Sequence, residues 1–218
     1  MKNDIYLILE NPNSYSIFIN NTNVNNQSCG YWCDSSLKKI LLNKELLKIG
    51  LNKIKLEILY TDNFSGFESI YLMGNFGVEN HNTLVKLKDV YSGQCLTEQN
   101  YPFYSGNTTY NYTFILEKEE DCQIKLNSFY GSALSFKIDN KEEQISFLPS
   151  GQQNLCVKLA PGQHQLSITI YGHRRNAFGP FYCERFFWIG PYEFSTTKLK
   201  EKKVVPLGLL EDPEVFLA

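Results

Sequence analysis

Short runs of alternating apolar and polar residues fill the chain, and clusters of Asn, Gly, Ser, Asp and Pro separate them. Such runs between turn residues are typical of β-strands with one buried face. In the clearest run, Ile54, Leu56 and Ile58 fall on one face, because side chains alternate along a strand. The pattern predicts strands at residues 5–9, 16–19, 53–59, 70–73, 110–116, 123–126, 134–138, 155–159 and 165–171.

Residues 36–48 are the only stretch with helix-like spacing of apolar residues, and that spacing is imperfect. We interpret this stretch as a strand and a turn, with room for one helical turn. The expected fold class is therefore all-β.

Two pairs of segments repeat a pattern along the chain. Residues 50–58 (GLNKIKLEI) match residues 162–170 (GQHQLSITI), and residues 17–24 (IFINNTNV) match residues 136–143 (FKIDNKEE). In each copy a strand and an Asn or Asp turn predict a hairpin, and a Gly-containing turn precedes a later strand. The repeat indicates two tandem jelly-roll β-sandwiches, over residues 1–88 and 89–218, joined near residues 86–95.

The two copies are unequal. The second has room for strands at residues 109–126 ahead of its hairpin, whereas the first has only residues 1–16. A sandwich without its leading strands keeps an unpaired sheet edge, which favours association. We expect the first sandwich to be incomplete at its N-terminus, in a chain that is part of a longer protein or is completed by a partner.

The composition fits folded domains and excludes several classes of function. Of 218 residues, 43% are hydrophobic and 20% are charged, which is enough to form a core. A net charge of −2 provides no cationic surface for nucleic acid or for an anionic membrane. The apolar run near the N-terminus is too short for a membrane helix or a signal-peptide core, so we expect a cytoplasmic protein.

The six cysteines give no clear metal site. Cys29 and Cys33 are close in sequence, but zinc needs a second Cys or His pair, which we do not find. Cys122 and Cys156 lie in strand-like apolar runs, where a free thiol behaves as a small buried hydrophobe. We expect reduced thiols and no cofactor. The sequence neither indicates nor excludes a structural Ca²⁺ site, because a site made of backbone carbonyls leaves little trace in sequence.

Several motifs occur in an order known from one family. YPFYSG spans residues 101–106, RRNAFGP spans 174–180, WIGP spans 188–191 and VPLGLL spans 205–210. Upstream, GYWCD spans residues 30–34 and GFESIYLMGNF spans 66–76. Together these motifs resemble the C-terminal galactose-binding-like (family 2-type sugar-binding) β-sandwich region of large bacterial glycoside hydrolases, described as α-L-rhamnosidase-like.

The resemblance covers nearly the whole chain and implies that both sandwiches are galactose-binding-like. The catalytic region that precedes these sandwiches in the family is missing from the sequence, which removes the active site. Tyr182 also stands where the family pattern has His after Gly-Pro. The resemblance therefore implies a non-catalytic module that binds a glycan or docks against a glycosidase catalytic domain.

Arg174, Arg175 and Asn176 are the strongest candidates for binding. A guanidinium donates several hydrogen bonds in one plane, which suits carboxylates and sugar hydroxyls, and an Asn amide both donates and accepts. The alternative, which we favour for loop polar groups, is that Arg175 and Asn176 bond backbone carbonyls and clamp the C-terminal tail.

Trp32, Tyr104 and Trp188 offer flat rings for stacking against pyranose rings. Asp34 follows Trp32 closely and is included as a ligand-binding candidate. For each ring the alternative is a place in a core or between domains, where aromatic residues commonly pack.

A glycosidase needs two carboxyl groups spaced for acid and for nucleophile or base roles. Asp62 and Glu68 flank a loop and Glu184 and Glu193 flank Trp188, but the sequence does not show that any of them converge. An active glycosidase fragment is therefore one alternative. A structural interaction protein, completed by a partner strand or by a second copy, is the other.

Overall fold

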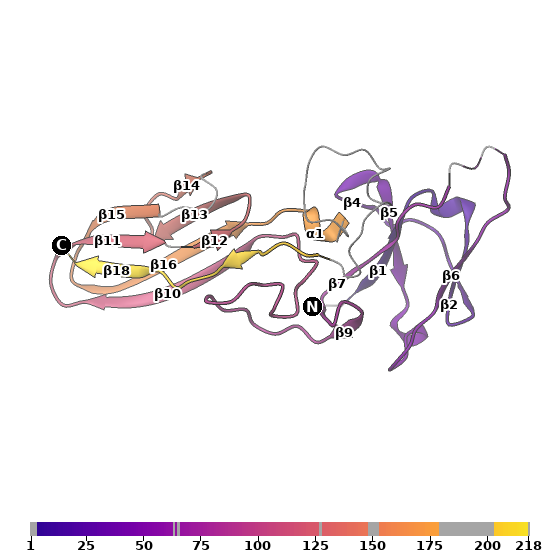
Figure 1. Cartoon of the computed structure of the whole chain (residues 1–218), viewed down its shortest axis with the longest axis horizontal. Coiled ribbons are helices and arrows are strands. Elements are labelled where there is room, and N and C mark those ends of the chain that lie inside the picture. The colour runs from indigo at the N-terminus through magenta and orange to yellow at the C-terminus, as the bar shows by residue number, and fades with distance from the viewer. Residues whose placement is uncertain are drawn as a thin grey trace. The chain divides into compact units, whose positions relative to one another are not determined.

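The computed structural model describes residues 4–62, 64, 66–126, 128–147, 153–178 and 203–217. The protein is mostly β, with 45% strand and 6% helix, and its sheets are antiparallel. The chain divides into two compact units, Met1–Phe76 (unit 1) and Gly77–Ala218 (unit 2), which the colours of Figure 1 distinguish. This division comes before residue 88, where the sequence suggested a boundary. No described helix is long and apolar enough to cross a membrane.

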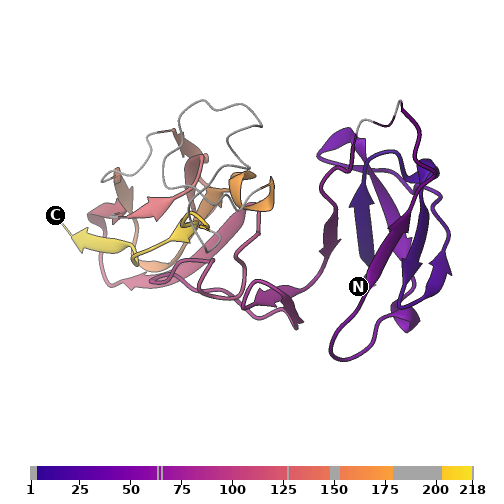
Figure 2. The ribbon, with the colours of Figure 1, turned by 45° about the vertical axis from the view of Figure 1, so that its right-hand side comes forward.

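The strands of unit 1 form two antiparallel sheets (Figure 2). They are β1 (Ile5–Leu9), β2 (Ser16–Ile19), β3 (Thr22–Val24), β4 (Tyr31–Trp32), β5 (Asp34–Leu42), β6 (Ile54–Glu57) and β7 (Tyr71–Gly74). The larger sheet has the order β4-β5-β1-β7, and the smaller has the order β3-β2-β6. Two short 3-10 turns, η1 (Pro12–Ser14) and η2 (Lys44–Leu46), lie in the connections.

A shared apolar core joins the two sheets of unit 1. Leu7 of the larger sheet and Ile17 of the smaller sheet belong to the same buried cluster. Because both sheets contribute to one cluster, the core lies between them. Ile54, Leu56 and Ile58 pack against this cluster, which confirms the face predicted from their alternation.

Unit 2 has two main antiparallel sheets and two small strand pairs. Its elements are β8 (Gly77–Glu79), β9 (Thr83–Val85), β10 (Thr108–Leu116), β11 (Glu120–Leu126), β12 (Phe129–Tyr130), β13 (Ala133–Ile138), β14 (Gln144–Ser146), β15 (Gln153–Leu159), β16 (Gly162–Tyr171), α1 (Arg175–Phe178), β17 (Gly208–Leu209) and β18 (Glu214–Leu217). The main sheets have the orders β10-β16-β13-β14 and β15-β11-β18, and the pairs are β12-β17 and β8-β9.

The core of unit 2 includes the C-terminal segment. Ile124 of β11 and Ile168 of β16 share one buried cluster, so the core lies between the two main sheets. Leu207 and Leu209 belong to the same cluster, while β17 pairs with β12 and β18 pairs with β11. The C-terminal segment therefore packs back on the sheets and core of unit 2.

Most of the predicted local structure is confirmed. Every strand predicted from the alternation is present, with ends shifted by a few residues at most. Residues 36–48 contain the end of β5 and the single turn η2, as expected. Cys122 is buried as expected, but the prediction for Cys156 was wrong: its side chain is exposed, because it lies on the outward face of β15.

The internal repeat folds into the same corner in each unit. In unit 1, Asn20 follows β2 with a φ of 50°, and its Oδ1 accepts a hydrogen bond from the N–H of Lys53 at 2.9 Å. In unit 2, Asp139 follows β13 with a φ of 50°, and its Oδ1 accepts from the N–H of Gln165 at 2.8 Å. Asn and Asp tolerate this left-handed backbone because their short side chains bond locally. Both repeats therefore have Asn or Asp at this turn because the residue must adopt a left-handed backbone and accept a hydrogen bond from the following strand.

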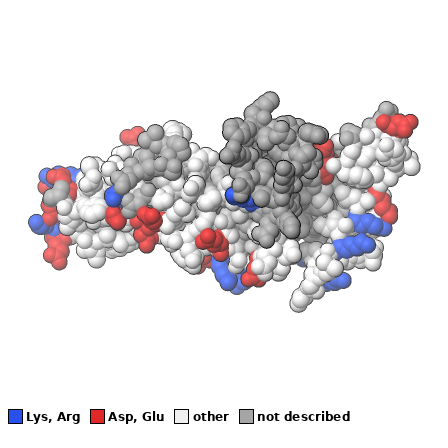
Figure 3. All heavy atoms as spheres, viewed as in Figure 1, with Lys and Arg blue, Asp and Glu red and all other residues white. Residues whose placement is uncertain are grey.

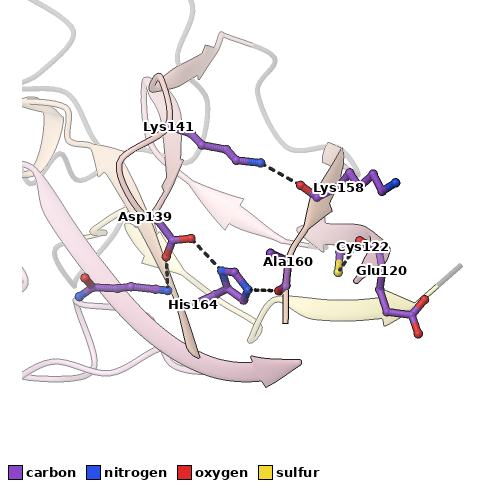
Figure 4. A network of polar contacts seen from close by, with 8 residues as sticks. Glu120, Cys122, Asp139, Lys141, Lys158, Ala160 and His164 are labelled. Carbon is purple, nitrogen blue, oxygen red and sulfur yellow. Dashed lines mark hydrogen bonds and ion pairs between the residues drawn. The ribbon is translucent and has the colours of Figure 1, made fainter. Parts of the chain in front are cut away.

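The two corners differ in the next contact. Asn20 Nδ2 donates to Asn52 Oδ1 at 2.8 Å, and Asn52 donates onward to a backbone carbonyl. At the matching position in unit 2, His164 Nδ1 lies 2.8 Å from Asp139 Oδ2, and its Nε2 lies 2.8 Å from the carbonyl oxygen of Ala160 (Figure 4). Both neighbours are acceptors, and a neutral imidazole has only one N–H. The contacts are therefore all satisfied only when His164 is protonated.

This pair shifts the pKa values of both partners. The hydrogen bonds to Asp139 and to the Ala160 carbonyl raise the pKa of His164 above its ordinary 6.5, against the opposing effects of burial and of Lys141. Burial works to raise the pKa of Asp139, but the hydrogen bonds from the Gln165 N–H and from His164 outweigh it and lower that pKa below 3.8.

We expect this corner to contribute most to the stability of unit 2 between pH 3.8 and pH 6.5, the ordinary values for the two groups. Above that range the His164 contribution is lost as the pH rises through its raised pKa, and below it the Asp139 contribution is lost as the pH falls through its lowered pKa. Urea unfolding, followed by backbone amide signals of unit 2 across this range, measures the effect.

The matched control is the double variant Asp139→Asn with His164→Asn, which copies the neutral Asn20 and Asn52 pair of unit 1. Its unfolding free energy should vary less with pH than that of the wild type on both sides of the maximum. The same pH dependence in both proteins would contradict the assignment.

Candidate functional site

Three loops meet at one end of unit 2, and we call them the rim: residues 101–107, 131–132 and 172–178. The N–H of Gly172 donates to Asn107 Oδ1 at 3.3 Å, and the hydroxyl of Ser132 donates to the carbonyl of Gly172 at 3.1 Å. The N–H of Ser132 also donates to the carbonyl of Tyr171 at 2.8 Å. Through these bonds the end of β16 fixes both neighbouring loops.

The rim packs backbone against backbone, which requires glycine. A Cβ atom on Gly172 would lie 2.2 Å from the carbonyl oxygen of Gly106 and 3.0 Å from that of Ser105. A Cβ atom on Gly131 would lie 2.6 Å from Ile170 Cγ2. The distances of 2.2 Å and 2.6 Å are shorter than real Cβ contacts allow, so the lack of a side chain lets Gly172 approach the loop at residues 101–107 and lets Gly131 approach the end of β16.

Tyr104 lies in the rim with 41% of its surface exposed. Its hydroxyl donates to the carbonyl of Asn107 at 2.9 Å, and its ring meets that of Tyr101 edge-on with centroids 6.2 Å apart. Partial burial, with Tyr101 beside it, raises the pKa of Tyr104, so the phenol stays neutral. The rim thus presents an ordered, amphipathic ring of the kind that sugars contact.

Three further predicted binding residues of unit 2, Arg174, Arg175 and Asn176, lie in and beside the turn α1 (Arg175–Phe178). Arg174 is exposed and Arg175 is half-buried. The N–H of Phe178 donates to the carbonyl of Arg174 at 3.0 Å, which closes the turn. Phe178 is partly exposed, so a cation and an aromatic ring are both presented by this short turn.

Asn176 holds the C-terminal segment. Its side chain is 1% exposed, its Nδ2 donates to the carbonyl of Val205 at 2.8 Å, and its Oδ1 accepts from the N–H of Val205 at 2.9 Å. The side-chain Nδ2 and Oδ1 of Asn176 are therefore both bonded to the backbone of Val205. This is the clamp that the sequence offered as the alternative to ligand binding.

Trp32 and Asp34 belong to unit 1 and form a separate candidate. Trp32 is half-buried, and its ring centroid lies 5.5 Å from that of Tyr71. Asp34 is exposed, and its Oδ1 accepts a hydrogen bond from the N–H of Ser36 at 2.8 Å. Hydrogen bonds from Ser36 lower the pKa of Asp34, so this carboxylate is engaged in its own turn.

Four residues weighed in the sequence lie outside the described residues: Tyr182, Glu184, Trp188 and Glu193. The other two carboxylates considered for catalysis, Asp62 and Glu68, lie in unit 1 and are exposed. Their predicted roles stay predictions.

The rim includes residues that sequence reasoning missed: Asn107, Ser132 and Gly172. Each stands next to the end of an observed strand, and Asn107 and Ser132 each follow a Gly that packs tightly. A Gly at the end of a strand commonly marks a close approach of backbones, and this was the available signal.

The described residues contain no group of three or more His, Cys, Asp and Glu placed to hold a metal ion. On the face shown in Figure 3, acidic and basic side chains are interspersed. That distribution agrees with the net charge of −2 and differs from the basic stripe of a nucleic-acid-binding surface.

No protein-family model and no curated protein matches the chain. Among solved structures, the chain is similar to a GH2 β-galacturonidase from Eisenbergiella tayi, in crystals with glycerol and with galacturonate. Sequence identity is 20% in both cases, with TM-scores of 0.33 and 0.32. The similar region covers 48% of this chain and only 18% of that enzyme. The likeness is therefore to a small part of that enzyme.

Proposed function

We propose that the chain is a non-catalytic carbohydrate-binding module of a glycoside hydrolase system, and that the rim of unit 2 holds the sugar. In this proposal both units are galactose-binding-like jelly-roll sandwiches, as the motifs of the sequence imply. Docking against a glycosidase catalytic domain is the architectural form of the same proposal.

The proposal rests on the side chains that the rim presents and on the contacts that fix its loops. It combines the partly exposed rings of Tyr104 and Phe178 with the exposed guanidinium of Arg174, on loops fixed by Gly172 and Asn107. Sugar sites commonly use aromatic faces for the apolar side of the ring and a few polar groups for the hydroxyls. An arginine adds a planar donor suited to carboxylates, which favours acidic sugars among the ligands.

The same rim argues against hydrolysis within it. Residues 101–107, 131–132 and 172–178 contain no Asp or Glu. Glycoside hydrolysis generally requires two carboxyl groups on either side of the scissile bond. These loops are therefore suited to hold a glycan and not to cleave it.

Tyr104→Ala and Arg174→Ala should each raise the dissociation constant for a bound glycan about tenfold, which corresponds to about 1.4 kcal/mol. A glycan array of neutral and acidic sugars identifies the ligand, and calorimetry with the purified full chain measures the affinity. Phe216→Ala is the matched control, because Phe216 is a partly exposed ring on β18, which lies at the opposite end of unit 2 from α1 (Figure 1).

The control should bind as the wild type does. Binding to no glycan on the array, or equal affinity in the rim variants and the wild type, would contradict the proposal. Turnover of aryl glycosides by the purified chain would support the fragment of an active glycosidase instead.

A further inference from the structure

The repeat makes strand β6 of unit 1 the counterpart of strand β16 of unit 2. Ile19 is opposite Ile54 in the β2-β6 pair, and Ile138 is opposite Leu166 in the β13-β16 pair. The two sequence repeats align Ile19 with Ile138 and Ile54 with Leu166, so the two strand pairs have the same register. Each unit thus contains the same three-stranded arrangement, β3-β2-β6 in one and β14-β13-β16 in the other.

The two arrangements differ at one edge. In unit 2, β10 covers the far side of β16 with an antiparallel register that runs from Thr108 opposite Ile170 to Leu116 opposite Gly162. In unit 1, β6 pairs with β2 alone among the residues that the structure describes. The counterpart of β10 is therefore not supplied by the described part of the chain.

Every second residue of β6 directs its backbone N–H and carbonyl groups toward this open edge. The N–H of Lys53 donates to Asn20 Oδ1, and its carbonyl accepts from the N–H of Asn20, so Lys53 faces β2. Because successive residues of a strand bond to opposite sides, the N–H and carbonyl groups of Ile54 and Leu56 face away from β2. In unit 2, the corresponding groups of Leu166 face β10.

The side chains show the same difference. Leu166 and Ile168 are 1% and 0% exposed, whereas their counterparts Ile54 and Leu56 are only half-buried. Leu51 before the strand and Leu59 after it are 87% and 86% exposed. Apolar side chains are therefore partly exposed along β6, where unit 2 buries their counterparts, and largely exposed just beyond its two ends.

We propose that the open edge of β6 binds an extended strand of a partner polypeptide, antiparallel to β6 and with the chemistry of β10. Its inward side chains, opposite Ile54 and Leu56, are large and aromatic or aliphatic, like Tyr112 and Tyr110 opposite the counterparts Leu166 and Ile168. Adding a strand to a sheet edge is an established mode of peptide recognition. The inference concerns unit 1 and does not depend on the proposed glycan site.

The charges on β6 favour a partner strand over a second copy of this chain. Lys55 and Glu57 are paired with each other at 2.7 Å, and Lys55 also lies 4.4 Å from the ring centroid of Phe18. Both charged side chains therefore already have partners within unit 1, and neither needs an ion pair with a second copy of the chain. Charged residues on an edge strand also oppose pairing between identical edges.

The test uses the full chain and a synthetic peptide of residues 107–117 (NTTYNYTFILE), which contains β10, with two added lysines for solubility. Hydrogen exchange of the Ile54 and Leu56 amides should slow about tenfold or more on adding the peptide, because their N–H groups become bonded. The Lys55 amide, which faces β2, should not change.

The matched control peptide is N-methylated at Tyr112, which keeps every side chain and removes the N–H expected to bond to Ile54. It should give no slowing. Unchanged exchange at millimolar peptide, or equal slowing with the control peptide, would overturn the proposal. So would a dimer in light scattering whose Ile54 and Leu56 amides are protected without peptide, because the occupant would then be a second copy.

Discussion

Replacement of Asn176 by alanine should lower the free energy of unfolding of unit 2 by about 2–4 kcal/mol. The Asn176 amide is the partner of both the N–H and the carbonyl of Val205, and its side chain is almost fully buried. Alanine would leave those two backbone groups without their partner and open a small cavity. Burying unpaired polar groups is among the few mechanisms that give losses of this size.

Urea unfolding followed by the amide signals of Leu207 and Leu209 measures this loss directly, since both residues are part of the core. Asn154→Ala is the control, because Asn154 is an exposed asparagine on β15 of the same unit. The control should change stability by less than about 0.5 kcal/mol. A similarly small effect for Asn176→Ala would show that the clamp does not hold the C-terminal segment.

Gly172→Ala should lower the stability of unit 2 by about 3 kcal/mol or more and should also remove glycan binding at the rim. The new Cβ atom would lie 2.2 Å from the Gly106 carbonyl oxygen, and that neighbour is backbone, which yields less easily than a flexible side chain. The loops at residues 101–107 and 172–178 would have to separate. Tyr104 and Arg174 would then lose the positions on which sugar binding is proposed to depend.

Gly93→Ala is the comparator for this prediction. Gly93 has a φ of 82°, and a Cβ atom there would meet nothing within 4 Å, so the substitution adds only backbone strain. It should cost about 1 kcal/mol and leave glycan affinity unchanged. If Gly172→Ala behaved like Gly93→Ala in both measurements, the close packing of the rim would not be essential.

The strands of the protein could be predicted because their signal is local. The alternation of residues such as Ile54, Leu56 and Ile58 indicates which face of a strand is buried, even when the strand that pairs with it is unknown. The repeated turns at Asn20 and Asp139 were visible for a similar reason, since a left-handed residue restricts the side chains that fit. The predicted clamp by Asn176 rested on a general rule, that loop polar groups satisfy nearby backbone.

Tyr104 and Arg174 of the rim were candidates from the sequence, but the convergence of the three loops could not be predicted, because the contacts that join them link residues far apart in the chain. Gly172 meets Asn107 and Ser132 only after β10, β13 and β16 have paired. The repeats contain both His164 and Asp139, but nothing in the sequence shows that these two residues pair, because they are 25 residues apart. Cys156 shows the limit of local reasoning, since an apolar neighbourhood along the sequence did not reveal which face of β15 it occupies.

The most direct test of the account is a map of the backbone amide shifts of the full chain with the glycan that ranks first on the array. The largest shifts should fall in residues 101–107, 131–132 and 172–178. Shifts confined to unit 1, around Trp32 and Asp34, or no shift with any glycan, would contradict a sugar site at the rim.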